Sequence, residues 1–238
     1  MKSKWDKINS ECWNANCYIR ANDIESGIDT TYNNVVVPYV KYFVNCFAEP
    51  DDKILDIGCG CGFLTNIISK SNSVIGIDIA ENFIEYSSRL YPHIPFYHKS
   101  IFDYKENGRF NICIATLVIH TISDLFGFFS VVKSILSQNG YFMFIIPHPC
   151  FWTYKKINKF NNYGTNDKMY ILPFKINKND DYPANMVYFH RTLSNYINTA
   201  INVGFEMIRM DELFENNKEK LENSSQLDLT GFILRKKS

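Results

Sequence analysis

Short apolar runs alternate with stretches of helical periodicity over the first 146 residues. Residues 34–47 carry apolar side chains at helical spacing and end before a polar break at 49–52. The predicted strands that follow are 53–57, 74–77, 94–98, 110–115 and 140–146, and the predicted helices are 63–70, 81–90 and 125–136. Strands that are apolar on both faces and alternate with helices indicate a parallel sheet covered on both sides.

This periodicity stops after residue 146 and resumes only near residue 192. The segment between is rich in Asn, Lys and Tyr and predicts no helix or strand of its own, which is typical of a functional insertion or of disorder. Its many aromatic residues speak against disorder. Residues 192–203 then predict a helix that Gly204 ends, and 205–210 and 229–235 predict the last two strands.

We therefore expect one α/β domain, a doubly wound sheet with an insertion after the fifth strand. Its expected parts are an N-terminal cap segment at 1–33, a core at 34–146, a lid insertion at 147–189 and the C-terminal part of the sheet at 190–238.

Composition narrows the class of protein. The 238 residues include 25 Lys+Arg and 25 Asp+Glu, and this balance argues against a protein that holds nucleic acid mainly by neutralising phosphates. The apolar runs are too short to span a bilayer, and the N-terminus lacks the apolar segment of a secretory signal. We expect a cytoplasmic protein. Seven cysteines form no disulfide framework, and the pair Cys59 and Cys61 has no further ligands beside it, so no metal site is expected.

Three glycines follow the first predicted strand, in the sequence ILDIGCGCG at 54–62. Glycines at 58, 60 and 62 allow a sharp turn and a close approach of the backbone to a nucleotide cofactor. A dinucleotide-binding motif would place another glycine where Phe63 stands. Asp56 would repel a pyrophosphate but attract a cationic amino-acid head group. The pattern therefore favours S-adenosylmethionine over NAD, with an NAD-dependent oxidoreductase as the residual alternative.

A second acidic residue supports this choice. Asp78 ends the second predicted strand, 22 residues after Asp56, where an acid in such folds accepts hydrogen bonds from ribose hydroxyls. Either carboxylate alone could equally be a helix cap or a turn former. Their place at the ends of neighbouring strands around three glycines favours a cofactor site.

The segments ILDIGCGCG and GIDIAENFI resemble the first two motifs of the class I S-adenosylmethionine-dependent methyltransferases over roughly residues 34–146. The resemblance implies a Rossmann-like sheet of seven strands whose last strand is antiparallel. It implies a cofactor-binding core in which the methionine end contacts Asp56, Gly58, Cys59, Gly60, Ala115, Thr116 and Leu117, and the ribose and adenine contact Asp78 and Ile79. Where the family usually has an adenine-binding Asp, this chain has Ser100, followed by Ile101, and Asp103 is the alternative.

Acceptor chemistry is expected downstream. The fourth strand lacks the Asn-Pro-Pro-Tyr or Asp-Pro-Pro-Tyr sequence of many base and amide N-methyltransferases. The segments IPHPCF and YFHRTLSNY resemble those of a bacterial small-molecule branch. His148 and His190 flank the insertion and are the candidate general bases, because a neutral imidazole accepts protons near pH 7. The candidate substrate-binding residues are Trp13, Tyr18, Trp152, Tyr154 and Arg191.

The insertion also suggests what the acceptor carries. Between 151 and 189 it has six lysines and three aspartates, and it is either a solvated loop or a lid whose charge attracts an anion. We expect methyl transfer to a small molecule, on oxygen and on a phosphate, phosphonate or carboxylate metabolite. The alternatives are a methyltransferase for RNA or protein and a cofactor-binding module without catalysis. Neither nucleic acid nor a membrane is an expected partner.

Overall fold

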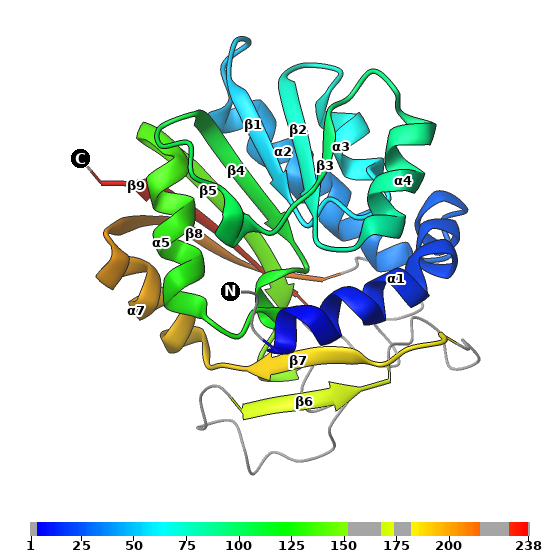
Figure 1. Cartoon of the computed structure of the whole chain (residues 1–238). Helices are drawn as coiled ribbons and strands as arrows, with labels where there is room; N and C mark the ends of the chain where they lie inside the picture. The colour runs from blue at the N-terminus through cyan, green and yellow to red at the C-terminus, as the bar shows by residue number, and fades with distance from the viewer. Residues whose placement is uncertain (1–3, 152–167, 174–181, 215–228, 238) are drawn as a thin grey trace.

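A seven-stranded sheet forms the centre of the computed structural model, which describes residues 4–151, 168–173, 182–214 and 229–237 (Figure 1). Its strand order is β3-β2-β1-β4-β5-β9-β8, and β6 and β7 pair in a second, two-stranded sheet. The strands are β1 (Lys53–Ile57), β2 (Ser73–Asp78), β3 (Phe96–His98), β4 (Phe110–Thr116), β5 (Leu136–Pro147), β6 (Lys168–Leu172), β7 (Met186–His190), β8 (Phe205–Leu213) and β9 (Leu229–Lys236).

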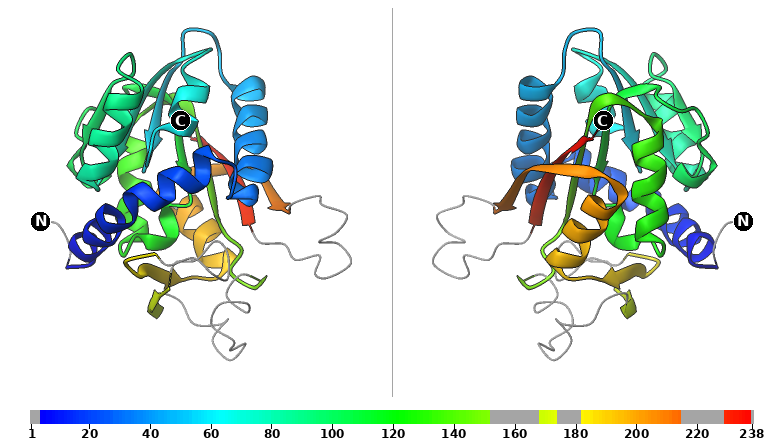
Figure 2. Two further views of the ribbon diagram at one scale, coloured as in Figure 1. Left: turned by 90° about the vertical axis from the view of Figure 1, so that its right-hand side faces the viewer. Right: turned by 90° about the vertical axis from the view of Figure 1, so that its left-hand side faces the viewer.

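Helices cover both faces of the large sheet (Figure 2). They are α1 (Lys4–Glu25), α2 (Val37–Phe47), α3 (Phe63–Ile68), α4 (Glu81–Leu90), α5 (Leu125–Ile135) and α7 (Leu193–Val203), with the short helices η1 (Tyr32–Val36), η2 (Ile101–Asp103) and η3 (Ile119–Thr121). The side chains of α1 to α4 join one apolar core, and those of α5 and α7 join the other. Because strand residues alternate between faces, Ile114 of β4 lies in the first core and Ala115 in the second.

The pairing confirms the predicted sheet. β1 to β5 pair with one another in parallel, whereas β9 is antiparallel to both β5 and β8. The winding reverses between β1 and β4, which places a crevice at the carboxyl ends of these two strands. Within the described residues, no helix has the length and apolar character needed to cross a bilayer.

The predicted absence of regular structure at 147–189 was wrong. β6 and β7 pair in antiparallel register there, from Lys168 opposite His190 to Leu172 opposite Met186. All five residues of β7 are buried, which hides the period-2 alternation that would have revealed a half-exposed strand.

Helix α1 runs along the edge where the parallel strands end and lies beside β7 (Figures 1 and 2). The Asn16 side chain joins it to the segment before β7: its Nδ2 donates to the Ala184 carbonyl at 2.9 Å and its Oδ1 accepts from the Ala184 N–H at 3.0 Å. The Asn14 side chain accepts from the Asn82 N–H at 2.9 Å and so joins α1 to α4. Helix α1 therefore covers the carboxyl edge of the sheet.

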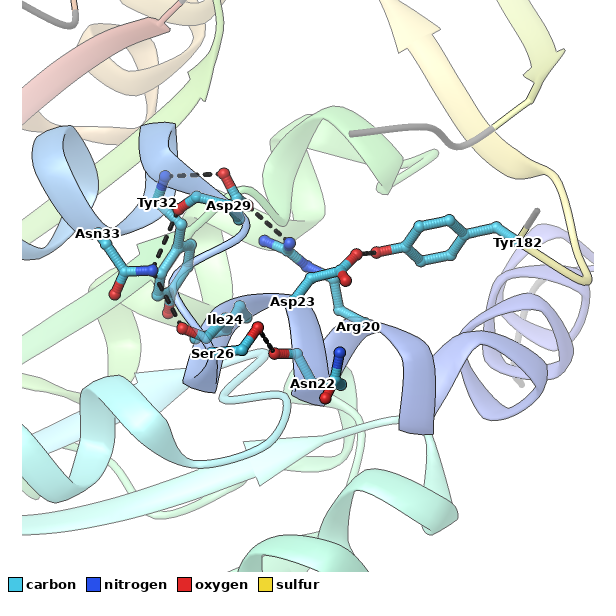
Figure 3. A network of polar contacts seen from close by, with 9 residues as sticks. All are labelled: Arg20, Asn22, Asp23, Ile24, Ser26, Asp29, Tyr32, Asn33 and Tyr182. Carbon is cyan, nitrogen blue, oxygen red and sulfur yellow. Dashed lines mark hydrogen bonds and ion pairs between the residues drawn. The ribbon is translucent and has the colours of Figure 1, made fainter. Parts of the chain in front are cut away.

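A buried ion pair joins α1 to the segment that leads into η1 (Figure 3). Arg20 Nη1 lies 2.6 Å from Asp29 Oδ2, and both side chains are 8% exposed. The other oxygen of Asp29 accepts from the Tyr32 N–H at 2.9 Å, and the Arg20 guanidinium lies over the Tyr32 ring. One turn along, Asp23 accepts a hydrogen bond from the Tyr182 hydroxyl. Every oxygen of Asp29 thus has a partner, as a buried charge requires.

We expect Arg20→Met to destabilise the protein strongly, because it leaves the Asp29 carboxylate buried without its counter-ion. Breaking a buried pair from one side typically costs about 3–5 kcal/mol in the free energy of unfolding. Urea denaturation followed by circular dichroism measures this change.

Arg235→Met is the matched control. Arg235 pairs with Glu206 at 2.6 Å, but both side chains are 42% exposed. An exposed pair contributes little, so this variant should unfold at close to the wild-type urea concentration. Equal losses in both variants would show that the Arg20 pair has no special role in holding α1.

Candidate functional site

The turn after β1 brings backbone amides to the carboxyl edge of the sheet. Gly58 and Gly60 have φ angles of 72° and 52°, which favour glycine. The N–H groups of Gly58 and Cys59 donate to the Ile77 carbonyl at 2.8 and 3.0 Å. A Cβ on Gly58 would lie 2.2 Å from the Val118 side chain, whereas one on Gly60 would meet nothing within 4 Å. Gly58 is therefore needed for packing, and Gly60 borders open space.

Asp78 ties the glycine turn to β2. Its Oδ2 accepts from the Gly60 N–H at 3.0 Å and its Oδ1 from the Ala80 N–H at 2.8 Å. Burial raises the pKa of this carboxyl group, and the backbone hydrogen bonds oppose that rise. Each carboxylate oxygen can accept a second hydrogen bond, so Asp78 can hold the turn and bind hydroxyl groups at the same time.

Asp56 lies beneath the turn and does not reach the open space beside it. The residue is 1% exposed, and its Oδ2 accepts from the Thr65 hydroxyl at 2.7 Å. Its Oδ1 has no hydrogen-bond partner among the described residues. Burial raises the pKa of Asp56 to about 7, and the bond from Thr65 opposes the rise.

A cavity of about 470 Å³ opens beside the glycine turn. Of the residues predicted to bind a cofactor, those that line it are Gly58, Cys59, Gly60, Asp78, Ile79, Ser100, Ile101, Thr116 and Leu117. Ser100 caps η2, its hydroxyl accepting from the Phe102 N–H at 3.4 Å. Leu117 has a φ of 58°, a strained conformation for leucine that turns the chain along the cavity wall after β4.

Ala115 is the exception among the residues at the end of β4. It is fully buried in the core beneath α5 and is not among the residues that line the cavity. Because successive strand residues point to opposite faces, Thr116 can reach the cavity while Ala115 packs beneath α5. The prediction for Ala115 is corrected accordingly.

Helix α1 supplies one aromatic side chain to the cavity. Trp13 lines it and packs against Phe83, with ring centroids 6.5 Å apart. Tyr18 does not line the cavity: it is 63% exposed and lies edge-on to Tyr86 on the outer surface. The prediction for Tyr18 therefore needs correction. Trp152 and Tyr154 lie outside the described residues.

The two histidines predicted as bases are buried away from the cavity lining. His148 is 1% exposed, with Nε2 3.3 Å from Glu212 Oε1 and Nδ1 accepting from the Cys150 N–H at 3.2 Å. Burial lowers the pKa of His148, and Glu212 opposes that change. His190 is fully buried, with Nδ1 3.4 Å from the Tyr188 hydroxyl. Both side chains stabilise the region around β7 and the end of β5.

The Arg191 side chain is likewise buried within the protein. It is fully buried, and its Nη2 donates to the carbonyls of Ile122 and Ser123 at 2.7 and 2.9 Å. Its guanidinium also lies over the Phe189 ring. Arg191 is not among the residues that line the cavity, so its side chain does not present a charge directly to a ligand there.

The sequence did not single out two polar residues that do line the cavity. His120 of η3 and Asn9 of α1 are each 3% exposed. Burial, aided by the positive charge of Arg191, lowers the pKa of His120 to about 3, so the imidazole is neutral near pH 7. Asn9 Nδ2 donates to the Thr121 hydroxyl oxygen at 3.0 Å. The two side chains lie close in the fold although 111 positions separate them in the sequence.

Comparison with known proteins agrees with this geometry. A family model described as "Methyltransferase domain" matches residues 48–188. The chain belongs to this methyltransferase-domain family. It is 26% identical over 135 residues to a protein of Invertebrate iridescent virus 6 named as a presumed methyltransferase, a match that covers 54% of this chain and 46% of the viral protein. The aligned part thus spans less than half the length of that relative.

Solved structures share the methyltransferase fold. An S-adenosylmethionine-dependent methyltransferase from Methanosarcina mazei superposes with a TM-score of 0.66 at 16% identity, covering 82% of this chain and 97% of the other. A 1,6-didemethyltoxoflavin-N1-methyltransferase from Burkholderia thailandensis, with 1,6-didemethyltoxoflavin and S-adenosylhomocysteine bound, superposes with a TM-score of 0.61 at 12% identity, covering 92% of this chain and 85% of the other. At these identities the likeness is one of fold.

The methyltransferase domain of this chain offers a matched test of the glycine turn. Gly60→Ala should weaken binding of S-adenosylhomocysteine at least tenfold, because its Cβ would project into the open space that Gly60 borders. Isothermal titration calorimetry measures the affinity. Gly108→Ala is the control, since Gly108 also has a positive φ and open space around it but does not line the cavity. Equal affinities of both variants would contradict the assignment of this turn to the cofactor.

A second test uses the raised pKa of Asp56. The folded protein favours the neutral acid, so ionisation costs stability as pH rises from about 4, the usual value in an unfolded chain, to about 7. Asp56→Asn still accepts from Thr65 but does not ionise. At pH 8 it should be more stable than the wild type by about 1–3 kcal/mol, and the difference should shrink steadily as pH falls toward 4.

Urea denaturation at several pH values measures this difference. Asp51→Asn is the control, because Asp51 is exposed and its carboxylate stays in water in both states. A constant difference between Asp56→Asn and the wild type across pH 4–8 would contradict the expectation.

Proposed function

We propose that this protein transfers a methyl group from S-adenosylmethionine to a hydroxyl oxygen of a small molecule. One observation carries the proposal: a single cavity joins the glycine turn and Asp78 to a second wall built from α1, η3 and β7. Such a cavity can hold a nucleoside at one end and an acceptor at the other. Membership of the methyltransferase-domain family supports the same reaction.

The residues at the cofactor end fit S-adenosylmethionine. Asp78 can accept hydrogen bonds from ribose hydroxyls, the open space at Gly60 lets the ligand approach the backbone, and Ser100 and Ile101 border the same end. When bound, this cofactor supplies an electrophilic methyl group on a sulfonium centre. Asp56, which is buried behind the turn, adds negative charge when ionised but makes no direct contact with the cavity.

The protein's own contribution is orientation and exclusion of water. Trp13 and the rest of α1 cover the cavity, and Ile24, Ile122 and Met186 give its acceptor end an apolar wall. Holding two reactants in line in such an enclosure can contribute up to about 7–11 kcal/mol to catalysis. Proton abstraction by His148 or His190 was the sequence-based expectation. We do not assign proton abstraction to either histidine, because both side chains are buried outside the cavity lining.

The charged residues of the described cavity lining indicate which kind of acceptor group the cavity suits. They comprise the acids Asp6, Asp29 and Asp78 and the bases Arg20 and Lys99, and Arg20 is paired with Asp29. This set provides no excess of positive charge for a phosphate, phosphonate or carboxylate. Of the six lysines on which that expectation rested, only Lys168 falls within the described residues. We therefore propose an uncharged acceptor group, and an anionic group stays a prediction from the sequence.

Turnover with a metabolite extract tests the proposed function. The protein should convert S-adenosylmethionine to S-adenosylhomocysteine only when extract is present, and mass spectrometry should find one small compound heavier by a methyl group. Asp78→Ala is the negative control, since it removes the carboxylate assigned to the ribose. Turnover that needs RNA or protein instead of small molecules would favour the macromolecular alternative. Binding of S-adenosylmethionine without turnover on any of these pools would favour a non-catalytic module.

A further inference from the structure

Two buried polar side chains, one from α1 and one from η3, lie in the cavity wall. His120 Nδ1 and Asn9 Oδ1 have no hydrogen-bond partner among the described residues, and both side chains are 97% buried. A buried acceptor without a partner typically costs about 1–3 kcal/mol, and native structures contain few of them. Two such atoms in one cavity wall need an explanation, and a ligand that carries hydrogen-bond donors provides one.

The orientation of the Asn9 amide follows from its neighbours. The Thr121 hydroxyl donates its proton to the Val118 carbonyl at 2.8 Å, so its oxygen can only accept from Asn9. The Asn9 atom 3.0 Å from that oxygen must therefore be the amide nitrogen. Its carbonyl oxygen Oδ1 is then the atom without a partner. Since Thr121 follows His120 directly in η3, Asn9 is held beside that histidine.

The charge state of His120 sets what it can recognise. Near pH 7 its imidazole is neutral, with one nitrogen that donates and one that accepts. The Arg191 guanidinium, fully buried beneath η3, disfavours a positive charge at this imidazole. An ammonium group would meet the same repulsion. A carboxylate has no proton to give to the Asn9 carbonyl oxygen or to the ring nitrogen of His120 that accepts. A neutral hydroxyl group meets both requirements.

We propose that His120 and Asn9 recognise the uncharged hydroxyl group of an apolar, phenol-like acceptor, an inference that rests on the proposed methyl transfer. The apolar part of the acceptor lies against Trp13, Ile122 and Met186, and its O–H donates to the imidazole or to the Asn9 carbonyl. The buried charge of Arg191 disfavours protonation of the imidazole, so one ring nitrogen of His120 can accept from the hydroxyl group. His120 and Asn9 contact the acceptor directly, whereas Arg191 acts through space.

Binding of three small probes tests this assignment. p-Cresol, benzylamine and benzoate share one ring and differ in carrying a neutral hydroxyl, a cation and an anion. Their affinities are measured by NMR titration, with and without saturating S-adenosylhomocysteine. The wild-type protein should bind p-cresol most tightly. His120→Phe keeps a ring but removes both nitrogens, and it should weaken p-cresol binding about tenfold, the value of one net hydrogen bond.

The control is His93→Phe, the same substitution at an exposed histidine outside the cavity lining, which should bind p-cresol like the wild type. His120→Phe should also retain the wild-type affinity for S-adenosylhomocysteine. If that variant does not fold, the ¹⁵N resonances of the His120 ring in the wild type give the same answer, because p-cresol should shift one of them. Unchanged p-cresol affinity in His120→Phe, unmoved His120 resonances, or tightest binding of benzylamine or benzoate would overturn the proposal.

The same titrations separate this proposal from the proposed function. If S-adenosylhomocysteine does not bind the wild type, the proposed methyl transfer fails, whatever the probes do. If it binds and p-cresol does not depend on His120, only the assignment of the acceptor site fails.

Discussion

The reversal of winding between β1 and β4 is the constraint on which the rest of this structure depends. The chain leaves β1 toward one edge of the sheet and reaches β4 only after β2 and β3 are in place. No crossover helix can then cover the carboxyl ends of β1 and β4, and a crevice stays open there. The glycine turn, Asp78 and the strained Leu117 all border it. Helix α1 and β7 close the crevice from outside and convert it into a cavity.

Different kinds of contact hold the two ends of that cavity in place. Asp78 holds the glycine turn through the Gly60 N–H, so the cofactor end is shaped by neighbouring strands and short-range hydrogen bonds. The acceptor end depends instead on contacts between distant segments: the Arg20 and Asp29 ion pair, Asn16 with Ala184, and Asn9 with Thr121. The shape of the cofactor end thus depends on the sheet, and the shape of the acceptor end depends on how α1 packs against the sheet.

This division explains what the sequence could predict. The glycine spacing and Asp78 sit at strand ends that hydrophobic runs reveal, so most of the fold was predicted, and most of the residues predicted to bind a cofactor line one cavity. His120 follows a predicted strand but was not singled out, because its significance comes from Asn9 and Arg191, which no local pattern connects to it. His148, His190 and Arg191 stand in recognisable motifs, yet the structure buries all three side chains: His190 and Arg191 at the end of the buried β7, and His148 after β5 beside Glu212. At the end of β4, only the position of the cavity decides that Thr116 and not Ala115 faces it.

Because the two cavity ends come from different parts of the chain, they need not change together as such a protein evolves. The family match covers residues 48–188 and includes the glycine turn and Asp78, whereas Asn9, Trp13 and Arg20 lie before it. The residues that α1 adds to the cavity lining thus come from outside the matched region. We expect relatives that share the core to differ more in this helix than in the glycine turn.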